Sequence, residues 1–271
     1  MHPESPRQLF DLYCSLREHF GFAPQWWPGT PDEIALTAIL VQQCSWDVAW
    51  DAVLQLRESR LTTLAALAGA EEQHIHQAIR RVTFGPTKAK RLQQIAGLVL
   101  ERGKTSFAEL LNSASTTELR PWLLTLPGFG RETTDAVLLY AGNQHPVFVV
   151  DAYARRVFSR LDSLPLPDKA LKPAGYEMLR TFVEQQVRSA LPLYRQLEFP
   201  ADVPLEVAIF RDLHAQLVEL ARHHCHRNRP RCQRQGAVGW PGYAICENHC
   251  LPEICGRCPL SETCDFPQDA E

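Results

Sequence analysis

The stretch LPGFGRETTDAVLLYAGNQHPVFVVDAYARR, from Leu126 to Arg156, decides how this chain folds. It opens with the turn PGFG, in which Gly128 and Gly130 allow backbone conformations that side chains would block. The segment after the turn has its apolar residues at helical spacing. The pattern predicts two helices joined by a tight turn, whose backbone N–H groups would suit a phosphate oxygen.

A short β-branched run, Val147 to Val150, lies near the end of this stretch and is followed directly by Asp151. An aspartate before AYARRVF is a favourable N-cap for a further helix. Taken alone, the pattern also fits a purely structural helical hairpin in which Asp151 does no more than cap a helix.

The rest of the chain also indicates an all-α protein. Its 271 residues suffice for one large domain or two small ones, and 45% of them are hydrophobic, as in ordinary globular proteins. No strand pattern is longer than residues 147–150. Helical spacing recurs along the chain, with the longest helices expected at about residues 4–20, 33–46, 87–103, 173–190 and 205–223.

Charge and composition limit the partners and the location. The formal net charge of −3 argues against a protein whose whole surface is strongly basic, but not against a local basic groove. No apolar run reaches the roughly 18 residues of a spanning helix, so we expect no membrane partner. The start MHPESPRQLFDLY lacks the basic and apolar regions of a signal peptide, which favours a cytoplasmic protein.

The hairpin and the aspartate together resemble the helix-hairpin-helix and Gly/Pro-Asp signature of the endonuclease III superfamily of DNA glycosylases. The match is carried by Leu126, Pro127, Gly128, Gly130, Val150 and Asp151. The resemblance implies that Asp151 is catalytic. It also implies that the hairpin grips a DNA phosphate through its backbone, at Pro127, Gly128, Phe129, Gly130 and Arg131.

The same resemblance implies a fold of two helical blocks with the active-site cleft between them. We expect a six-helix block with the hairpin over residues 32–147. Residues 1–31 and 148–224 would form the second block, which carries Asp151. Residues 225–271 would form a cysteine-rich tail.

Glu132 stands where bifunctional members of the superfamily carry a lysine. An enzyme that also cuts the DNA strand needs an amine to form a Schiff base with the sugar, and a carboxylate cannot form one. We therefore expect hydrolysis of the N-glycosidic bond with little or no lyase activity, and count Glu132 with Asp151 among the catalytic candidates. Asp151 could stabilise positive charge on the sugar and orient a water. The alternative is that Glu132 only complements the helix dipole.

The strings GRETTDAVLLYA and PVFVVDAY most resemble the monofunctional 3-methyladenine (alkylpurine) glycosylases of endonuclease III type. A flipped base is held by aromatic stacking, and a cationic alkylpurine favours electron-rich rings. We expect Trp46 and either Trp26 or Trp27 to enclose the base, although the tryptophans could instead fill the interface between the blocks. The base pocket implied is Trp26, Trp27, Pro28, Trp46 and Tyr153.

Three further residues are candidates for DNA contact. In the superfamily a glutamine at the position of Gln42 fills the gap left by the flipped nucleotide, although a polar helix end alone would also explain it. Lys88 and Arg91 lie near a glycine turn and a helix start, in FGPTKAKRL, and could contact phosphate. A solvated basic face is the alternative for both.

Nine cysteines are unusual for this composition, and seven of them fall between Cys225 and Cys264. In a chain without a secretory signal, this clustering indicates metal rather than disulfides. The superfamily often carries a [4Fe–4S] cluster on a C-x6-C-x2-C-x5-C run, which suits four thiolates. Here an insertion, residues 233–254, splits the run. We favour as ligands Cys225, Cys255, Cys258 and Cys264, with Cys232 as the alternative to Cys255, and structural zinc as the alternative metal.

The insertion and the segment before it add two weaker expectations. Cys246, His249 and Cys250, with Cys232, could hold a second metal, or they could be free thiols. The arginine-rich segment 226–235 could approach the DNA backbone.

These patterns favour the hypothesis of a monomeric base-excision DNA glycosylase. It would act on damaged double-stranded DNA, flipping alkylated purines out of the helix and removing them. Within the same fold, the alternatives are an endonuclease III-like enzyme for oxidised pyrimidines and an inactive paralogue. An alternative of another class is a non-catalytic Fe–S protein that binds DNA and senses damage. A zinc-dependent transcription regulator fits the Val-Val-Asp run poorly.

Overall fold

The computed structural model describes residues 5–23, 26–228, 230, 232, 258–264 and 266. Within these residues the chain is all-α, as predicted, and forms no β-strand. Cys255 and the insertion, with the second-metal candidates Cys246, His249 and Cys250, lie outside them. No helix in the described part of the chain is long and apolar enough to cross a membrane.

The chain divides into two compact units. One unit combines residues 1–26 with residues 147–271, and the other contains residues 27–146. The expected boundaries were 31/32 and 147/148, and most of the expected tail, residues 225–271, lies outside the described residues. The two ends of the chain therefore fold together, and the middle forms a unit of its own.

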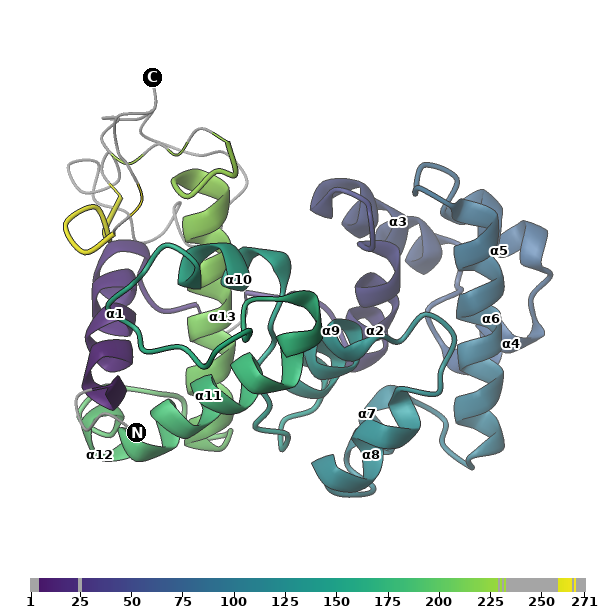
Figure 1. Ribbon diagram of the computed structural model, residues 1–271. Coiled ribbons are helices and arrows are strands. Elements are labelled where there is room, and N and C mark those ends of the chain that lie inside the picture. The colour runs from purple at the N-terminus through teal and green to yellow at the C-terminus, as the bar shows by residue number, and fades with distance from the viewer. Residues whose placement is uncertain are drawn as a thin grey trace. The chain divides into compact units, whose positions relative to one another are not determined.

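The middle unit is built around α2 (Pro31–Leu40), which is buried along nearly its whole length, as its all-round apolar pattern predicted. It contacts α3, α6, α7, α9 and η1 (Figure 1). The other helices of this unit are α3 (Trp46–Glu58), α4 (Leu64–Gly69), α5 (Glu72–Ala78), α6 (Gly85–Glu101), α7 (Phe107–Leu111), α8 (Thr116–Leu123), α9 (Arg131–Ala136) and the π-helix η1 (Val137–Ala141).

Both ends of α2 are set by local interactions. At its start Thr30 and Glu33 form a capping box, in which each side chain accepts a hydrogen bond from the other residue's amide. At its end the chain turns through Gln43, whose φ of 54° is left-handed. The helix was expected to continue to Trp46, but Trp46 instead begins α3.

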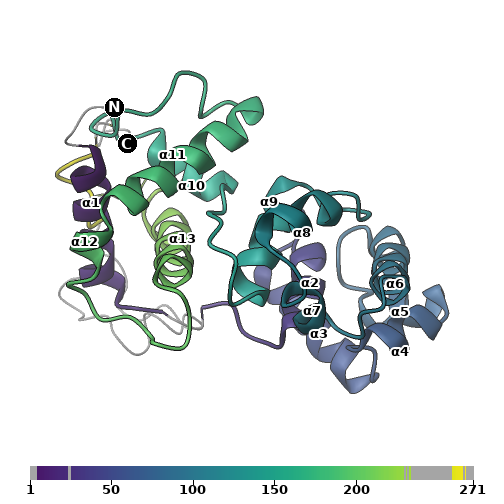
Figure 2. The same ribbon diagram turned by 90° about the horizontal axis from the view of Figure 1, so that it is seen from below.

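The unit formed by the two chain ends is built around α13 (Leu205–His223), which contacts α1 and α10. Figure 2 looks nearly along α13 and shows α1 and α12 to its left and α10 and α11 above it. Tyr13 of α1 donates a buried hydrogen bond of 2.7 Å to Asp212 of α13. The remaining elements are α1 (Ser5–Phe20), α10 (Ala152–Phe158), the 3-10 turn η2 (Pro173–Gly175), α11 (Tyr176–Ser189) and α12 (Leu191–Tyr194).

The β-branched run that precedes Asp151 is buried without belonging to a sheet. Side chains of α11 take the place of strand partners. The Phe148 amide donates to Glu184 Oε1 at 3.0 Å, and the Val150 amide donates to the Tyr176 hydroxyl at 3.4 Å. Buried amides need such partners, so side chains of α11 fix the backbone that directly precedes Asp151.

His19 lies at the end of α1, buried against the rings of Phe20 and His224 at centroid distances of 4.5 and 5.5 Å. Burial, together with the nearby His224 and His223, lowers the pKa of His19 to about 4. The folded protein therefore keeps this imidazole neutral over a range in which the unfolded chain would protonate it.

We expect the free energy of unfolding to fall as the pH drops from about 6.5 to about 4, because over this range the unfolded state binds a proton at His19 that the folded state does not. The His19→Leu variant should lose up to about 3 kcal/mol of this pH dependence in urea titrations. His74→Leu, at an exposed histidine of α5, should keep all of it. The same pH dependence in His19→Leu as in the wild type would contradict the assignment.

Candidate active site

The hairpin between α8 and α9 has the left-handed turn residue expected at Gly128, but not at Gly130, whose φ of −79° any residue can adopt. Gly128 has a φ of +84°, in the left-handed region that favours glycine, and a Cβ atom there would lie 3.1 Å from the Arg91 side chain. The Gln42 carboxamide donates to Gly128 O and to Thr133 Oγ1, both at 2.9 Å. In this structure Gln42 therefore ties the end of α2 to the hairpin, and Arg91 lies beside the turn.

The start of α9 presents backbone amides. Its N-cap, Gly130, has no side chain to satisfy the first-turn N–H groups, which a helix leaves without internal partners. Arg131 and Glu132 on this turn are exposed. Behind the turn, Arg120 forms a bidentate pair with the buried Asp135, at 2.6 and 3.0 Å. The hairpin is thus fixed from inside while its first turn faces outward.

Asp151 is the N-cap of α10, as its position in the sequence predicted. Its Oδ1 accepts a hydrogen bond of 2.6 Å from the Ala154 amide. Its Oδ2 lies 3.7 Å from Nε2 of His214, on α13. Asp151 is 9% exposed. One carboxylate oxygen is therefore held by the helix start, and the other faces a buried imidazole.

The aromatic residues expected around a base are divided between the two units. In the middle unit, Trp27 and Trp46 touch edge to face, with centroids 5.3 Å apart and planes at 83°, and Trp27 also packs on Tyr140 at 5.2 Å. This contact leaves no parallel slot between Trp27 and Trp46, so the expectation that these two rings could enclose a base is not met in this structure. Pro28 is exposed beside them.

Trp26 belongs to the other unit and is held there by two contacts. Its indole Nε1 donates to Glu219 Oε1 at 2.8 Å, and its ring meets the His214 ring edge-on at 5.8 Å. Because His214 also faces Asp151, Trp26 and Asp151 both lie next to the same imidazole. Trp26 is partly exposed.

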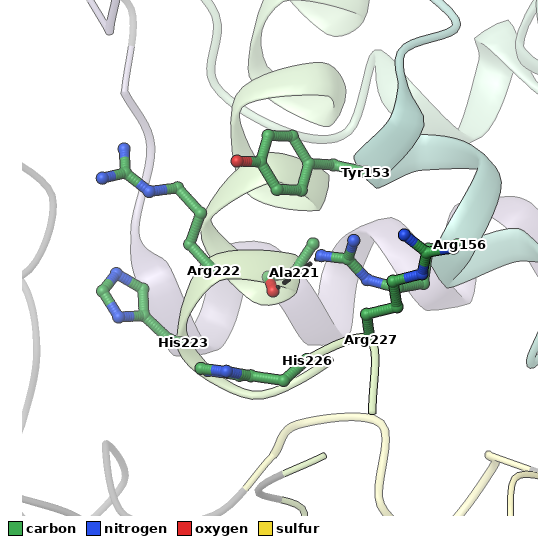
Figure 3. A pocket seen from close by; sticks show the side chains of 7 residues that line it. All are labelled: Tyr153, Arg156, Ala221, Arg222, His223, His226 and Arg227. Atoms are coloured by element: carbon green, nitrogen blue, oxygen red, sulfur yellow. Dashed lines mark hydrogen bonds between the residues drawn. The ribbon is translucent and has the colours of Figure 1, made fainter. Parts of the chain in front are cut away.

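A pocket of about 350 Å³ opens between the start of α10 and the end of α13 (Figure 3). We call it the basic pocket. Its lining contains three arginines, two histidines and no acidic residue, and consists of Tyr153, Arg156, Ala221, Arg222, His223, His226 and Arg227. Arg156 is fixed by donating to the carbonyls of Cys225 and Ala221 at 2.6 and 2.9 Å. Arginine-rich linings of this kind suit phosphate oxygens.

Tyr153 was expected in the base pocket, but it lines the basic pocket instead. The Arg156 guanidinium lies 5.1 Å from the centroid of its ring. That ring face is therefore already taken by a cation, and a positively charged base would meet three arginines beside it. The structure therefore gives no support to the expectation that Tyr153 stacks on a cationic alkylpurine.

Lys88 was expected to contact phosphate, but the structure places it inside the middle unit. It is 2% exposed, and its amine donates to the carbonyls of Leu40 and Gln42 at 2.8 and 2.5 Å. Both carbonyls belong to the end of α2, where a cation complements the helix dipole. Lys88 is a capping residue of α2, which corrects the sequence-based expectation.

We therefore predict that Lys88→Met lowers stability rather than DNA affinity. The substitution leaves two largely buried carbonyls without their donor and should cost about 1–3 kcal/mol in urea unfolding. The neighbouring Lys90→Met, at an exposed position of α6, should change stability by less than about 0.5 kcal/mol. A normal stability of Lys88→Met together with weakened DNA binding would restore the phosphate-contact interpretation.

Phe84 was not anticipated by sequence reasoning. It is 60% exposed, and its φ of 57° is left-handed, which is costly for a bulky residue. It stands as N-cap of α6, directly before Gly85 and Pro86. A large aromatic residue before a Gly-Pro helix start was the available signal.

Four cysteines line one small apolar cavity, which we call the cysteine pocket: Cys225, Cys232, Cys258 and Cys264. The Cys258 amide donates to the Cys232 carbonyl at 3.1 Å, which joins the two halves of the split cysteine pattern. Within the described residues, no three or more histidine, cysteine, aspartate or glutamate side chains come together so as to hold a single metal ion. In a [4Fe–4S] cluster each thiolate binds a different iron, so four sulfurs around one cavity need not meet at a point.

Arg160 supplies positive charge to the cysteine pocket. Its guanidinium is buried, donates to Cys225 Sγ at 3.1 Å and lies 4.0 Å from the Phe266 ring centroid. Burial raises the pKa of Cys225, Cys232 and Cys258, the last to about 12, while Arg160 lowers that of Cys225. Such thiols release their protons only beside a strong positive charge, which the iron ions of a cluster would provide.

Comparisons with known proteins match this chain to a protein family and to solved structures. A model of the HhH-GPD superfamily of base excision DNA repair proteins matches residues 36–173. A protein of Methanocaldococcus jannaschii, provisionally named a DNA repair glycosylase, is 27% identical over 257 residues, which cover 94% of this chain and 95% of that protein.

Solved structures share the fold. The H. pylori 3-methyladenine DNA glycosylase bound to 1,N6-ethenoadenine superimposes with a TM-score of 0.66 at 24% identity, over 80% of this chain and 97% of that one. Endonuclease III in a non-covalent complex with DNA superimposes with a TM-score of 0.61 at 18% identity, over 89% and 94% of the two chains.

Proposed function

The chain belongs to the HhH-GPD superfamily of base excision DNA repair proteins, and we propose that it is a monofunctional DNA glycosylase for alkylated purines. The observation that carries this proposal is the fixed carboxylate of Asp151 at the start of α10, in a chain whose hairpin helix begins with Glu132 instead of a lysine. The likeness to a 3-methyladenine glycosylase supports the substrate class.

Asp151 is the group assigned to the reaction. As the C1′–N bond breaks, its electron pair goes to the base, and the sugar gains positive charge that a nearby carboxylate stabilises. A water then adds its oxygen to C1′ and gives up a proton to Asp151 or solvent. An alkylated purine that carries a positive charge leaves as a neutral base and needs little help from an acid. His214, 3.7 Å from Oδ2, limits how the carboxylate can turn.

Glu132 accounts for the absence of strand cleavage in this proposal. It is exposed on the first turn of α9. By the resemblance to the superfamily, this is the position at which bifunctional members carry a lysine. Its carboxylate cannot attack C1′ to form a Schiff base. The reaction therefore ends at the abasic site.

The proposed DNA contacts combine amides, cations and one apolar side chain. The first-turn amides of α9 and the nearby Arg91 suit one phosphate, and the basic pocket suits another. Exposed Phe84 is suited to enter the base stack, as apolar wedges do in other DNA-binding proteins. Gln42 can take this role only if it leaves its hydrogen bonds to the hairpin.

We also propose that the cysteine pocket holds a [4Fe–4S] cluster on Cys225, Cys232, Cys258 and Cys264. The set uses Cys232, the alternative ligand from the sequence, in place of Cys255. When bound, the cluster would join the end of α13 to the tail covalently. Arg160 would balance part of its negative charge.

The ligand set predicts which cysteines retain iron. Cys232→Ser should lose most of the iron and acid-labile sulfide of anaerobically purified protein, because one of the four thiolates is removed. Cys255→Ser should retain both. Iron loss in Cys255→Ser with retention in Cys232→Ser would support the sequence-based set instead. Zinc in place of iron and sulfide, in the wild type, would show a structural zinc site.

The function is tested with duplexes that carry one lesion, either 3-methyladenine or thymine glycol, analysed before and after hot alkali. We expect the alkylpurine strand to break only after alkali. Asp151→Asn should lower single-turnover excision by about 10²- to 10³-fold, because an amide can still cap α10 but carries no charge. Glu206→Gln, on a partly exposed residue of α13, is the control and should behave as wild type.

The other outcomes separate the alternatives. Activity on thymine glycol but not on the alkylpurine would indicate an oxidised-pyrimidine enzyme. Strand breakage before alkali would show that an amine acts in place of Glu132. Tight binding of damaged DNA with no base release, unaffected by Asp151→Asn, would favour a non-catalytic damage sensor.

A further inference from the structure

Glu219 is a buried acidic residue of α13 that takes no part in the proposed reaction. It is 1% exposed, and both of its oxygens have nitrogen partners. Oε1 accepts the indole N–H of Trp26 at 2.8 Å, and Oε2 lies 3.0 Å from His223 Nε2. A carboxylate this deeply buried is tolerated only when such partners compensate its lost hydration.

These contacts extend from Glu219 to the catalytic carboxylate. The Trp26 ring that donates to Glu219 packs edge-on against His214, and His214 faces Asp151. All of these residues belong to the unit formed by the two chain ends. Trp26 therefore cannot rotate without disturbing either the buried carboxylate or the imidazole beside Asp151. Part of its surface remains exposed and can meet a ligand.

The partner of the indole N–H also affects the face of the ring. A hydrogen bond to a charged acceptor is stronger than one to a neutral acceptor, and it polarises the donor. Electron density pushed into the indole makes its face more negative, and a negative face attracts cations. A neutral base gains much less from such a face than a positively charged one.

We propose that Glu219 is a positioning and specificity residue, which orients Trp26 and makes its indole selective for positively charged bases. The proposal rests on the proposed function, because it assumes that Trp26 meets the excised base. Glu219 acts through Trp26 and does not itself touch the base. It explains why a costly carboxylate is kept inside α13, where an apolar residue would pack without penalty.

The test uses two duplexes of the same sequence that differ only in the lesion. One carries the cationic base 7-methylguanine, and the other carries the neutral base 1,N6-ethenoadenine. Glu219→Gln keeps the size of the side chain and an acceptor oxygen for Trp26, but removes the charge. We expect single-turnover excision of 7-methylguanine to fall about tenfold, and that of ethenoadenine to change less than about twofold. Glu206→Gln on the same helix should leave both rates unchanged.

Trp26→Phe provides the second arm, because it keeps an aromatic face but removes the N–H that Glu219 holds. It should lower the preference for the cationic lesion by a similar factor. In the Trp26→Phe background, Glu219→Gln should then change the preference no further, so that the two substitutions are not additive. This arm also keeps the test valid if Glu219→Gln alone folds poorly.

The outcomes separate this inference from the proposed function. Equal loss on both lesions in Glu219→Gln, or an additive effect in the double variant, would show a purely structural role and overturn the inference. Failure of the wild type to excise 3-methyladenine, 7-methylguanine and 1,N6-ethenoadenine alike would instead overturn the proposed function. Retention of the preference in Trp26→Phe would show that the selective ring lies elsewhere.

Discussion

The hydrogen bond from the Ala154 amide to Asp151 is the constraint on which the proposed chemistry depends. It fixes one carboxylate oxygen at the start of α10 and leaves the other directed toward His214. The run before Asp151 cannot shift easily, because side chains of α11 hold its amides at Phe148 and Val150. A catalytic group needs such support on rigid elements, since small displacements of a reacting group are costly in rate.

Helix α13 connects Asp151 to the other parts of this unit that the proposal uses. Along its length, it supplies His214 beside the aspartate, Glu219 to hold Trp26, and Arg222 to the basic pocket. Just past its end, Cys225 enters the cysteine pocket. A tail fixed to α13 by a metal cluster would therefore also steady the lining of the basic pocket. This arrangement explains why a deeply buried helix carries so many polar residues.

Much of the fold could be predicted, because it is governed by local rules. Gly128 needs the left-handed region, Asp151 precedes a helix start, and α2 is apolar on every side. The position of Lys88 could not be predicted. A lysine on an amphipathic helix is usually solvated, and its burial here depends on two carbonyls that lie more than forty residues earlier in the chain.

The missed parts of the candidate site have a shared physical cause, which is pairing between residues distant in sequence. Trp26 and Glu219 are separated by 193 positions, so no periodicity links them. The choice between Cys232 and Cys255 depends on how the chain returns after the insertion, which spacing alone does not describe. Trp46 and either Trp26 or Trp27 were expected to enclose a base, but sequence gives no ring angle, and Trp27 and Trp46 touch edge to face.

The central claim is that the glycosidic bond is broken by hydrolysis governed by Asp151, with no covalent amine intermediate. Borohydride trapping during turnover tests this most directly, because it reduces any Schiff base between protein and DNA to a stable crosslink. The wild-type protein, incubated with an alkylpurine duplex and borohydride, should release base and give no crosslinked band on a denaturing gel. A crosslink that forms in proportion to base release, and that maps to a lysine, would contradict the account.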